Sequence, residues 1–356
     1  MPDSLGLAAP IDRIAVFRAL MLGDMLCATP ALRAVRAALP GAEITLVGLP
    51  WARSLAQRLG CVDHFVEFPG YPGLPERACD LRAFPAFIQD MQARDFDLVL
   101  QLHGSGGIAN PLIALFRGRH SAGFRSRTGW WPPDEAGRFI PWPERVHEIE
   151  RLLALTDRLG MPRRGLHLDY PVSDDDRTEL AALWPAMAQA RPYVCIHAGA
   201  QLSSRRWPVD RFAAVADVIA EQGRTVVLTG SAQETELVAE LAARMRRPSV
   251  NLAGRTSLWT LGALVEGAER VVCNDTGISH IAAALRRPSL VVSSGSDVSR
   301  WAPLDAERHQ VLWHDLPCRP CGYAVCPEQH DCARAVTVDD VVGTLARASG
   351  WREQRV

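Results

Sequence analysis

Short apolar runs that alternate with helix-like patterns constrain the fold of this chain more than any other feature. In the first half, runs suited to buried strands cover residues 14–17, 44–48, 64–67 and 98–101. The alternation restarts at Tyr193, and further runs cover residues 225–228, 249–252, 270–273 and 289–292. Strands that are apolar on both faces and separated by helices are typical of parallel sheets covered by helices. The sequence therefore predicts an α/β protein built on parallel sheets.

A break in this alternation near residue 170 indicates two domains. The chain has 356 residues, which suits two hydrophobic cores better than one. Residues 168–176 contain a proline and a run of aspartates, a composition typical of an interdomain connection. We place the boundary there, with domains at residues 1–170 and 171–335 and a last helix within residues 336–356.

The composition excludes several classes of protein. The chain is 48% hydrophobic and 22% charged, so it can build full cores and is not disordered. Its formal net charge of -1 argues against a nucleic-acid-binding protein. No apolar stretch approaches the ~20 residues of a membrane span, and the N-terminus lacks the basic start and apolar core of a secretion signal. We expect a cytoplasmic protein.

All 39 basic residues are arginine, because the sequence contains no lysine. A lysine Schiff base and a P-loop lysine are therefore excluded. Any phosphate-binding site in this protein must use arginine, hydroxyl groups and backbone N–H groups.

The most informative motif spans residues 271–280. An apolar run ends at Asn274 and is followed by an acid, a hydroxyl and a glycine, after which a helical pattern begins at Ile278. The first turn of a helix offers unpaired N–H groups and a partial positive charge, and both attract phosphate. The candidates for a ligand site are Asp275, Thr276, Gly277, Ser279 and His280. An ordinary capped helix after a strand would give the same pattern.

Similar strand-to-helix turns occur twice more in the second half. After the strand that begins at Tyr193, a loop of small residues leads to Ser203, Ser204, Arg205 and Arg206. Open α/β sheets bind ligands at the carboxyl ends of their strands, and the planar guanidinium of arginine suits phosphate. The two arginines could instead be a solvated pair on a surface loop. The turn after residues 225–228 contributes Thr229 and Glu234.

In the first half, Asp24 and a glycine-rich loop are the candidates. Asp24 follows the strand at residues 14–17 and lies at the start of a helical pattern, where it is either a functional acid or a simple N-cap. Residues 102–107, which include His103 and three glycines, follow the strand at residues 98–101. Such a loop is either a turn alone or part of a site.

These segments together resemble glycosyltransferase family 9, the bacterial heptosyltransferases of lipopolysaccharide core synthesis. The resemblance covers nearly the whole chain, and its motifs are residues 23–24 with 29–32, 205–208, Gly230 with Glu234, and 274–280. It implies a fold of the GT-B type, with two Rossmann-like parallel-sheet domains facing across a cleft. It assigns acceptor binding to domain 1–170 and nucleotide-sugar binding to domain 171–335. It also implies that the C-terminal helix packs back on the first domain.

The resemblance further implies an inverting sugar transfer that requires no metal cofactor. Asp24 would be the general base, and Arg205, which stands where the family usually has lysine, would neutralise charge on the departing diphosphate. The candidates for donor binding are Ser203, Ser204, Thr229, Glu234, Thr256, Asp275, Thr276, Gly277, Ser279 and His280. Weaker candidates for an acidic acceptor are Arg53 and Arg125, with Arg119 and His120.

The nine cysteines fall into two groups. Five lie in apolar contexts and are expected to be small buried residues. The other four are Cys318, Cys321, Cys326 and Cys332. Three interpretations of this group remain open: a structural zinc site, disulfide or redox pairing, and reduced thiols in a packed loop.

The main prediction is an enzyme that moves a heptose, or a related sugar, from an ADP-sugar to a lipopolysaccharide core or a similar glycan. The expected partners are ADP-heptose and a glycolipid or oligosaccharide acceptor, with peripheral contact at the inner face of the cytoplasmic membrane. The alternatives are a transferase that uses another nucleotide sugar and a non-catalytic nucleotide-binding protein of the same fold. A dehydrogenase is not favoured, because the first turn lacks the Gly-x-Gly-x-x-Gly fingerprint.

Overall fold

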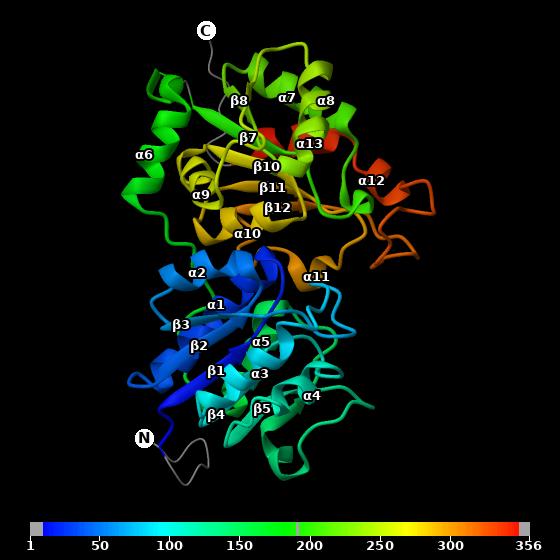
Figure 1. Cartoon of the computed structure of the whole chain (residues 1–356). Coiled ribbons are helices and arrows are strands. Elements are labelled where there is room, and N and C mark those ends of the chain that lie inside the picture. The colour runs from blue at the N-terminus through cyan, green and yellow to red at the C-terminus, as the bar shows by residue number, and fades with distance from the viewer. Residues whose placement is uncertain (1–9, 190–191, 349–356) are drawn as a thin grey trace. The chain divides into compact units, whose positions relative to one another are not determined.

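Each half of the chain folds around its own six-stranded parallel sheet (Figure 1). The computed structural model describes residues 10–189 and 192–348. Its internal contacts divide the chain into two units, Met1–Pro171 and Val172–Val356, and the division falls within the polar segment 168–176. The predicted α/β fold class with two parallel sheets is confirmed.

The first sheet has the strand order β3-β2-β1-β4-β5-β6, and all of its pairs are parallel. Its strands are β1 (Arg13–Phe17), β2 (Glu43–Gly48), β3 (His64–Glu67), β4 (Leu98–Gln101), β5 (His120–Arg125) and β6 (Phe139–Pro141). The strands β2 and β3 lie on one side of β1, and the later strands β4, β5 and β6 lie on its other side. The carboxyl ends of β1 and β4 therefore form a topological switch point, where open α/β sheets bind ligands.

Helices cover both faces of this sheet (Figure 1). On one face, α1 (Leu22–Ala38) packs against α5 (Glu148–Arg158). On the other, α3 (Phe84–Ala93) and α4 (Ala109–Ala114) add apolar side chains to the core around Phe17 and Phe116. The shorter elements are α2 (Arg53–Arg58), η2 (Pro50–Ala52) and η3 (Pro133–Arg138).

The second sheet repeats this plan, with the order β12-β11-β10-β7-β8-β9 and parallel pairs throughout. Its strands are β7 (Tyr193–His197), β8 (Thr225–Leu228), β9 (Val250–Asn251), β10 (Arg270–Asn274), β11 (Ser289–Val292) and β12 (His309–Leu312). Here the switch point lies between the neighbouring strands β7 and β10.

The helices of the second unit again form two layers (Figure 1). One layer contains α7 (Val209–Glu221), α8 (Thr235–Arg244) and α13 (Val338–Arg347), and the other contains α6 (Asp174–Leu183), α9 (Leu258–Gly267) and α10 (Gly277–Ala284). The shorter elements are η4 (Pro185–Gln189), η5 (Ser203–Arg205), η6 (Ala232–Glu234), α11 (Val298–Trp301) and α12 (Asp331–Ala335). Within the described residues, no helix has the length and apolar character needed to cross a membrane.

The C-terminal helix belongs to the core of the second unit. Val341 and Leu345 of α13 are buried against apolar residues of α7, and α13 also contacts β12. The expectation that a helix within residues 336–356 packs back on the first domain stays a prediction. Residues 349–356 lie outside the described part of the chain.

Two further segments differ from the sequence-based expectations. Residues 174–176 do not belong to a linker but begin α6: Ser173 and Asp176 form a capping box, in which Asp176 Oδ2 accepts from Ser173 N at 2.7 Å. The stretch 130–143 is rich in Trp, Pro and Gly, a composition that predicts an irregular loop, but it contains η3 and the short edge strand β6.

Candidate functional site

The candidates of the second unit gather at one edge of its sheet. Residues Ser203 to Arg206 follow β7, Thr229 and Glu234 follow β8, Thr256 follows β9, and residues 275–280 follow β10. Because all of these strands are parallel, the loops after them lie at the same carboxyl edge. The loops after β7 and β10 meet at the switch point. The structure therefore places these candidates at the carboxyl edge of the sheet, and their part in ligand binding stays a prediction.

Asn274, the last residue of β10, joins these two loops. Its Oδ1 accepts from Trp207 N at 2.8 Å, and its Nδ2 donates to the Ala198 carbonyl at 2.8 Å. Asn274 and Trp207 are fully buried. One amide thus satisfies a backbone donor and a backbone acceptor of the loop after β7. Asn274 belongs to the predicted motif, but its structural role was not predicted.

Helix α10 presents its N-terminus at this edge. Its N-cap is Thr276, whose side chain makes no capping hydrogen bond. The hydroxyl of Ser279 donates to the Thr276 carbonyl at 2.7 Å, and Ser279 is fully buried. Ser279 therefore uses its hydroxyl hydrogen within the helix, whereas the sequence interpretation assigned it to a ligand. His280 is buried edge-on against Trp301, with 6.3 Å between ring centroids.

Asp275 precedes the helix and is held from the neighbouring loop. Its Oδ2 accepts from the Ser296 hydroxyl, which lies 2.7 Å from the hydroxyl of Ser293. Both serines follow β11, so the loops after β10 and β11 are connected by side chains.

Arg205 is half-buried and oriented by carbonyl groups. Its Nη1 donates to the Ser294 carbonyl at 3.2 Å, and its Nη2 donates to the Cys321 carbonyl. Arg206 points elsewhere, because its Nε and Nη2 donate to the Ala200 carbonyl at 3.0 and 2.9 Å. The interpretation of the two arginines as a solvated pair is therefore wrong.

Ser203 and Ser204 attach the segment 318–332 to this edge. The Ser203 hydroxyl donates to the Ala324 carbonyl at 2.9 Å, and the Ser204 hydroxyl donates to the Tyr323 carbonyl. His330 Nε2 lies 2.8 Å from the Ser204 carbonyl oxygen. The two hydroxyl hydrogens predicted to bind a ligand are thus used to position this segment, against which Arg205 also rests.

The four cysteines of this segment do not form a ligand set. Among the described residues, no group of three or more His, Cys, Asp or Glu side chains is arranged to hold a metal ion, and all four thiols are free. The structure contains no disulfide among these four cysteines, and their disulfide or redox pairing stays a prediction. Burial raises the pKa of the Cys332 thiol above its ordinary value, which favours the protonated form. The metal content of the purified protein is the direct test of the zinc interpretation.

Glu234 lies between a capping serine and a glycine. Its Oε2 accepts from Ser231 N at 2.8 Å and from the Ser231 hydroxyl at 2.9 Å. A Cβ atom added to Gly199 would lie 2.0 Å from Glu234 Oε1, so the loop after β7 approaches this carboxylate closely. Only glycine permits that approach.

His197 was missed by the sequence analysis. It ends β7, and its Nδ1 lies 3.0 Å from the buried hydroxyl of Thr229. Its Nε2 lies 3.9 Å from Glu234 Oε2. Burial lowers the pKa of His197, which keeps the ring neutral. Thr256 is half-buried and precedes Ser257, the N-cap of α9.

In the first unit, Asp24 lies at the switch point between β1 and β4. It is the third residue of α1, and the N-cap is Met21, so the interpretation of Asp24 as an N-cap is wrong. Its side chain is 25% exposed, which leaves it accessible to a ligand. A negative charge in the first turn of a helix is favoured by the helix dipole.

Arg18, which directly follows β1, contacts Asp24 and was also missed by the sequence analysis. Arg18 is fully buried, its Nε donates to the Asp24 carbonyl at 3.0 Å, and its Nη2 lies 4.0 Å from Asp24 Oδ1. The same Nη2 donates to Glu148 Oε1 at 3.2 Å, and Nη1 donates to the Leu102 carbonyl. The sequence signal that could have identified Arg18 is a charged residue directly after an apolar strand run.

Two more residues near Asp24 were not predicted. Burial, and then the charge of Asp24, raises the pKa of Glu76, which lies in the loop before α3. His103, from the glycine-rich loop after β4, lies with its Nε2 3.7 Å from Glu76 Oε1. The loop 102–107 thus lies at the same edge of the sheet as Asp24, and its part in a functional site stays a prediction.

The weaker acceptor candidates are divided between the two edges of the first sheet. Arg53 begins α2, beyond the carboxyl end of β2, with its Nη2 3.7 Å from Glu67 Oε2. Arg125 ends β5 and packs over the Trp131 ring, 4.8 Å from its centroid. Both lie on the same edge as Asp24. Arg119 and His120 lie at the amino end of β5, which separates them from Asp24.

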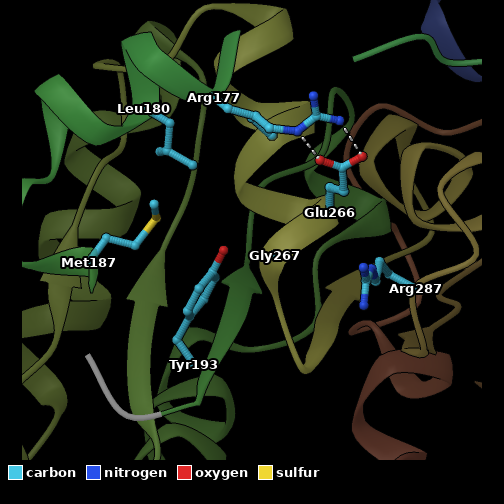
Figure 2. Close-up of a pocket in the computed structure, with 8 residues that line it drawn as sticks. Arg177, Leu180, Met187, Tyr193, Glu266, Gly267 and Arg287 are labelled. Carbon is cyan, nitrogen blue, oxygen red and sulfur yellow. Dashed lines mark hydrogen bonds and ion pairs between the residues drawn. The ribbon is translucent and has the colours of Figure 1, made fainter. Parts of the chain in front are cut away.

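A cavity of about 590 Å³ lies in the second unit, away from these loops (Figure 2). It opens beside Tyr193, the first residue of β7, and thus at the amino edge of the sheet. Arg177 Nε and Nη2 donate to the two oxygens of Glu266 at 2.7 and 2.9 Å. The Tyr193 hydroxyl donates to the Leu264 carbonyl at 2.7 Å. None of the predicted site residues lines this cavity.

Comparisons with known proteins bear on the family and the fold. The sequence profile of glycosyltransferase family 9 (heptosyltransferase) matches residues 85–331. Lipopolysaccharide heptosyltransferase 2 of Escherichia coli is 27% identical over 303 residues, which are 80% of this chain and 83% of the relative.

Two solved structures have the same fold. The structure of E. coli ADP-heptose lps heptosyltransferase II matches with a TM-score of 0.73 at 21% identity, over 94% of this chain and 97% of the other. A family 9 glycosyltransferase from Veillonella parvula matches with a TM-score of 0.77 at 18% identity, over 95% and 97% of the two chains. The two parallel sheets thus form a fold of the GT-B type. The chain belongs to glycosyltransferase family 9 and is a heptosyltransferase-like glycosyltransferase.

Proposed function

We propose that this enzyme transfers a heptose, or a related sugar, with inversion from ADP-heptose to a lipopolysaccharide core or a similar glycan. The observation that carries the proposal is that Arg205 and the N-terminus of α10 lie in the loops that follow the neighbouring strands β7 and β10, at the switch point of the second sheet. Lipopolysaccharide heptosyltransferases among the relatives support the donor and the acceptor. A glycolipid acceptor would bring the enzyme to the inner face of the cytoplasmic membrane.

The second unit would bind the diphosphate of the donor. Gly277 and Ile278 begin α10, and the first N–H groups of a helix have no partner within the helix. These groups and the helix dipole favour phosphate oxygens. Arg205 adds a permanent positive charge whose orientation is fixed by two carbonyl contacts. Glu234 would bind the ribose hydroxyls, and Asp275 would orient hydroxyls of the transferred sugar.

The first unit would supply the base. Asp24 accepts the proton from the acceptor hydroxyl as that oxygen attacks the anomeric carbon, and the bond to the diphosphate breaks on the opposite side. Negative charge then grows on the departing diphosphate, where Arg205 and α10 stabilise it. Because these groups supply the positive charge, the proposal includes a reaction that requires no metal ion.

The proposal is tested by the thermal stability of the chain with ADP-heptose, ADP-glucose, UDP-glucose and GDP-mannose. A donor at 100 times its Kd adds about 2.7 kcal/mol, or roughly 5–10 °C for a unit of this size. We expect this shift with ADP-heptose and a much smaller one with the UDP and GDP sugars. Arg205→Ala should reduce the shift. Arg244→Ala, which removes an exposed arginine of α8 in the same unit, is the matched control.

A shift with ADP-heptose but no release of ADP in the presence of acceptor would instead support a non-catalytic nucleotide-binding protein. A larger shift with a UDP or GDP sugar would reject ADP-heptose as the donor.

A further inference from the structure

Arg319 holds both ends of the loop at residues 293–296, which follows β11. Its Nη1 donates to the Ser293 carbonyl at 2.7 Å, and its Nη2 donates to the Ser296 carbonyl at 3.0 Å. The same Nη2 donates to the Ser293 hydroxyl at 3.2 Å. Within the described residues, every hydrogen bond of this guanidinium goes to the loop. The planar fork of arginine suits such a bridge between two backbone groups.

Two other contacts hold the middle of the loop. The Ser294 carbonyl accepts from Arg205 Nη1 at 3.2 Å, and the Gly295 carbonyl accepts from Cys321 N at 2.9 Å. Gly295 has a φ of +68°, and a Cβ atom added there would lie 2.9 Å from Cys321 Sγ. Four consecutive carbonyl groups are therefore fixed. Loss of Arg319 would release the two ends of the loop, while its middle would stay attached.

The hydroxyl of Ser296 connects this loop to Asp275. It donates to Asp275 Oδ2, and it lies 2.7 Å from the hydroxyl of Ser293. Asp275 is half-buried, and its Oδ1 accepts no hydrogen bond from the described residues. One oxygen of the carboxylate is thus used to orient the side chain, and the other is available to a donor from a ligand.

A carboxylate that reads a sugar needs a fixed orientation. The terminal torsion of an aspartate has a broad preference, so its own backbone does not set the direction of the two oxygens. The hydrogen bond from Ser296 supplies that direction, and Arg319 fixes the backbone that carries Ser296. Polar groups that recognise a ligand are precise only when a second layer of contacts holds them.

We propose that Arg319 is a positioning residue of the donor site, which acts through Ser296 to hold Asp275 in the orientation that accepts a hydroxyl of the transferred sugar. This inference rests on the proposed function, because it takes from it that Asp275 faces the sugar. Its effect should be confined to the sugar, since the diphosphate is assigned to Arg205 and α10.

The test measures the Kd for ADP and for ADP-heptose by titration calorimetry. The ratio of the first Kd to the second is the gain in affinity that the sugar provides. The ratio is compared among the wild type, Arg319→Ala, Ser296→Ala, Asp275→Ala and the double variant that combines Arg319→Ala with Asp275→Ala. Ser296→Ala removes a single hydroxyl, so it carries the test if Arg319→Ala does not fold.

Two control variants remove the same kinds of contact elsewhere in the second unit. Arg211→Ala removes a half-buried arginine that also donates to backbone carbonyls, those of Ala333, Arg334 and Val336. Ser299→Ala removes an exposed hydroxyl that donates to Asp297 Oδ1 at 2.6 Å. Melting temperatures without ligand show how much stability each variant loses.

We expect Asp275→Ala to lower the ratio about 10- to 100-fold, the range for a hydrogen bond to a charged group. Arg319→Ala and Ser296→Ala should lower it about 3-fold or more, because the carboxylate remains but is no longer oriented. The double variant should have the same ratio as Asp275→Ala, because Arg319 acts only through Asp275. The Kd for ADP should stay close to that of the wild type, and both controls should keep the wild-type ratio.

Three results would overturn the inference. The ratio could be unchanged in both Arg319→Ala and Ser296→Ala. Arg319→Ala could weaken the binding of ADP and ADP-heptose equally, which would show support of the diphosphate site or of the fold. The double variant could show additive losses, which would mean that Arg319 acts on the sugar without Asp275.

Failure of the proposed function has a different signature. A wild type that binds another nucleotide sugar more tightly than ADP-heptose would reject the proposed donor. The same ratio, taken for that nucleotide sugar and its own nucleoside diphosphate, would then decide the inference. A wild type that gains no affinity from any of these sugars would overturn the inference.

Discussion

Replacing Asn274 by alanine should destabilise the second unit by removing the link between the loops after β7 and β10. The change leaves the buried Trp207 N–H and the buried Ala198 carbonyl without their partners, which lie at 2.8 Å in both cases. An unsatisfied buried backbone group costs about 1–3 kcal/mol. For the two groups together we expect a loss of about 3 kcal/mol. In a unit of this size, that loss lowers the melting temperature by roughly 6–12 °C.

Circular dichroism during heating measures this effect. Asn251→Ala is the matched control, because Asn251 also ends a strand of the same sheet but is exposed and accepts only from Ala253 N at 3.0 Å. The control should melt within about 2 °C of the wild type, as is usual for surface changes. A melting temperature of Asn274→Ala that matches the control would refute the argument that this amide holds the two loops.

Four other changes have specific expected outcomes. Gly199→Ala places a Cβ 2.0 Å from Glu234 Oε1 and should weaken donor binding about 10-fold or more, measured by titration calorimetry. Arg205→Ala should lower kcat roughly 10- to 1000-fold, because negative charge builds on the diphosphate in the transition state, and Arg205→Lys should recover much of the lost kcat. An unaffected kcat would show that the phosphate-binding site lies elsewhere. Transfer should survive excess EDTA, and loss of activity restored by Mg²⁺ would overturn metal independence. Folding lowers the pKa of His103 to about 3, so below about pH 6.5 the unfolded chain binds a proton that the folded chain does not. The free energy of unfolding should therefore decrease as the pH is lowered from 6.5 to 3. His103→Gln should reduce this dependence, measured by urea titrations, by up to about 1.4 kcal/mol per pH unit.

The sequence predicts the sheets well, because buried parallel strands are uniform apolar runs. The strands β1, β4, β8 and β11 follow from this signal alone. β5 and β12 carry polar residues at edge or near-edge positions, and β6 is a short edge strand, so their apolar signal is weak. The start of α6 was mistaken for a linker, because a run of aspartates is typical both of a linker and of the first turn of a helix.

The site was predicted at the level of loops rather than of contacts. Asp24, Arg205 and residues 275–280 follow strands, and strand ends can be found by pattern. Glu76 could not be found in this way, because it lies in an irregular loop and only folding brings its Oε1 to 3.7 Å from His103 Nε2. The hydroxyls of Ser203, Ser204 and Ser279 donate to backbone carbonyls, which residue type alone does not reveal. Their part in donor binding stays a prediction.

The central claim, that Asp24 is the base of a sugar transfer, is tested most directly by the acceptor-dependent rate of ADP release from ADP-heptose in Asp24→Asn. The amide keeps the shape of the side chain and cannot take the proton. We expect donor binding and the melting temperature to stay close to those of the wild type, while the rate falls about 10²-fold or more. A rate close to that of the wild type would contradict the assignment of Asp24 and, with it, the proposed mechanism.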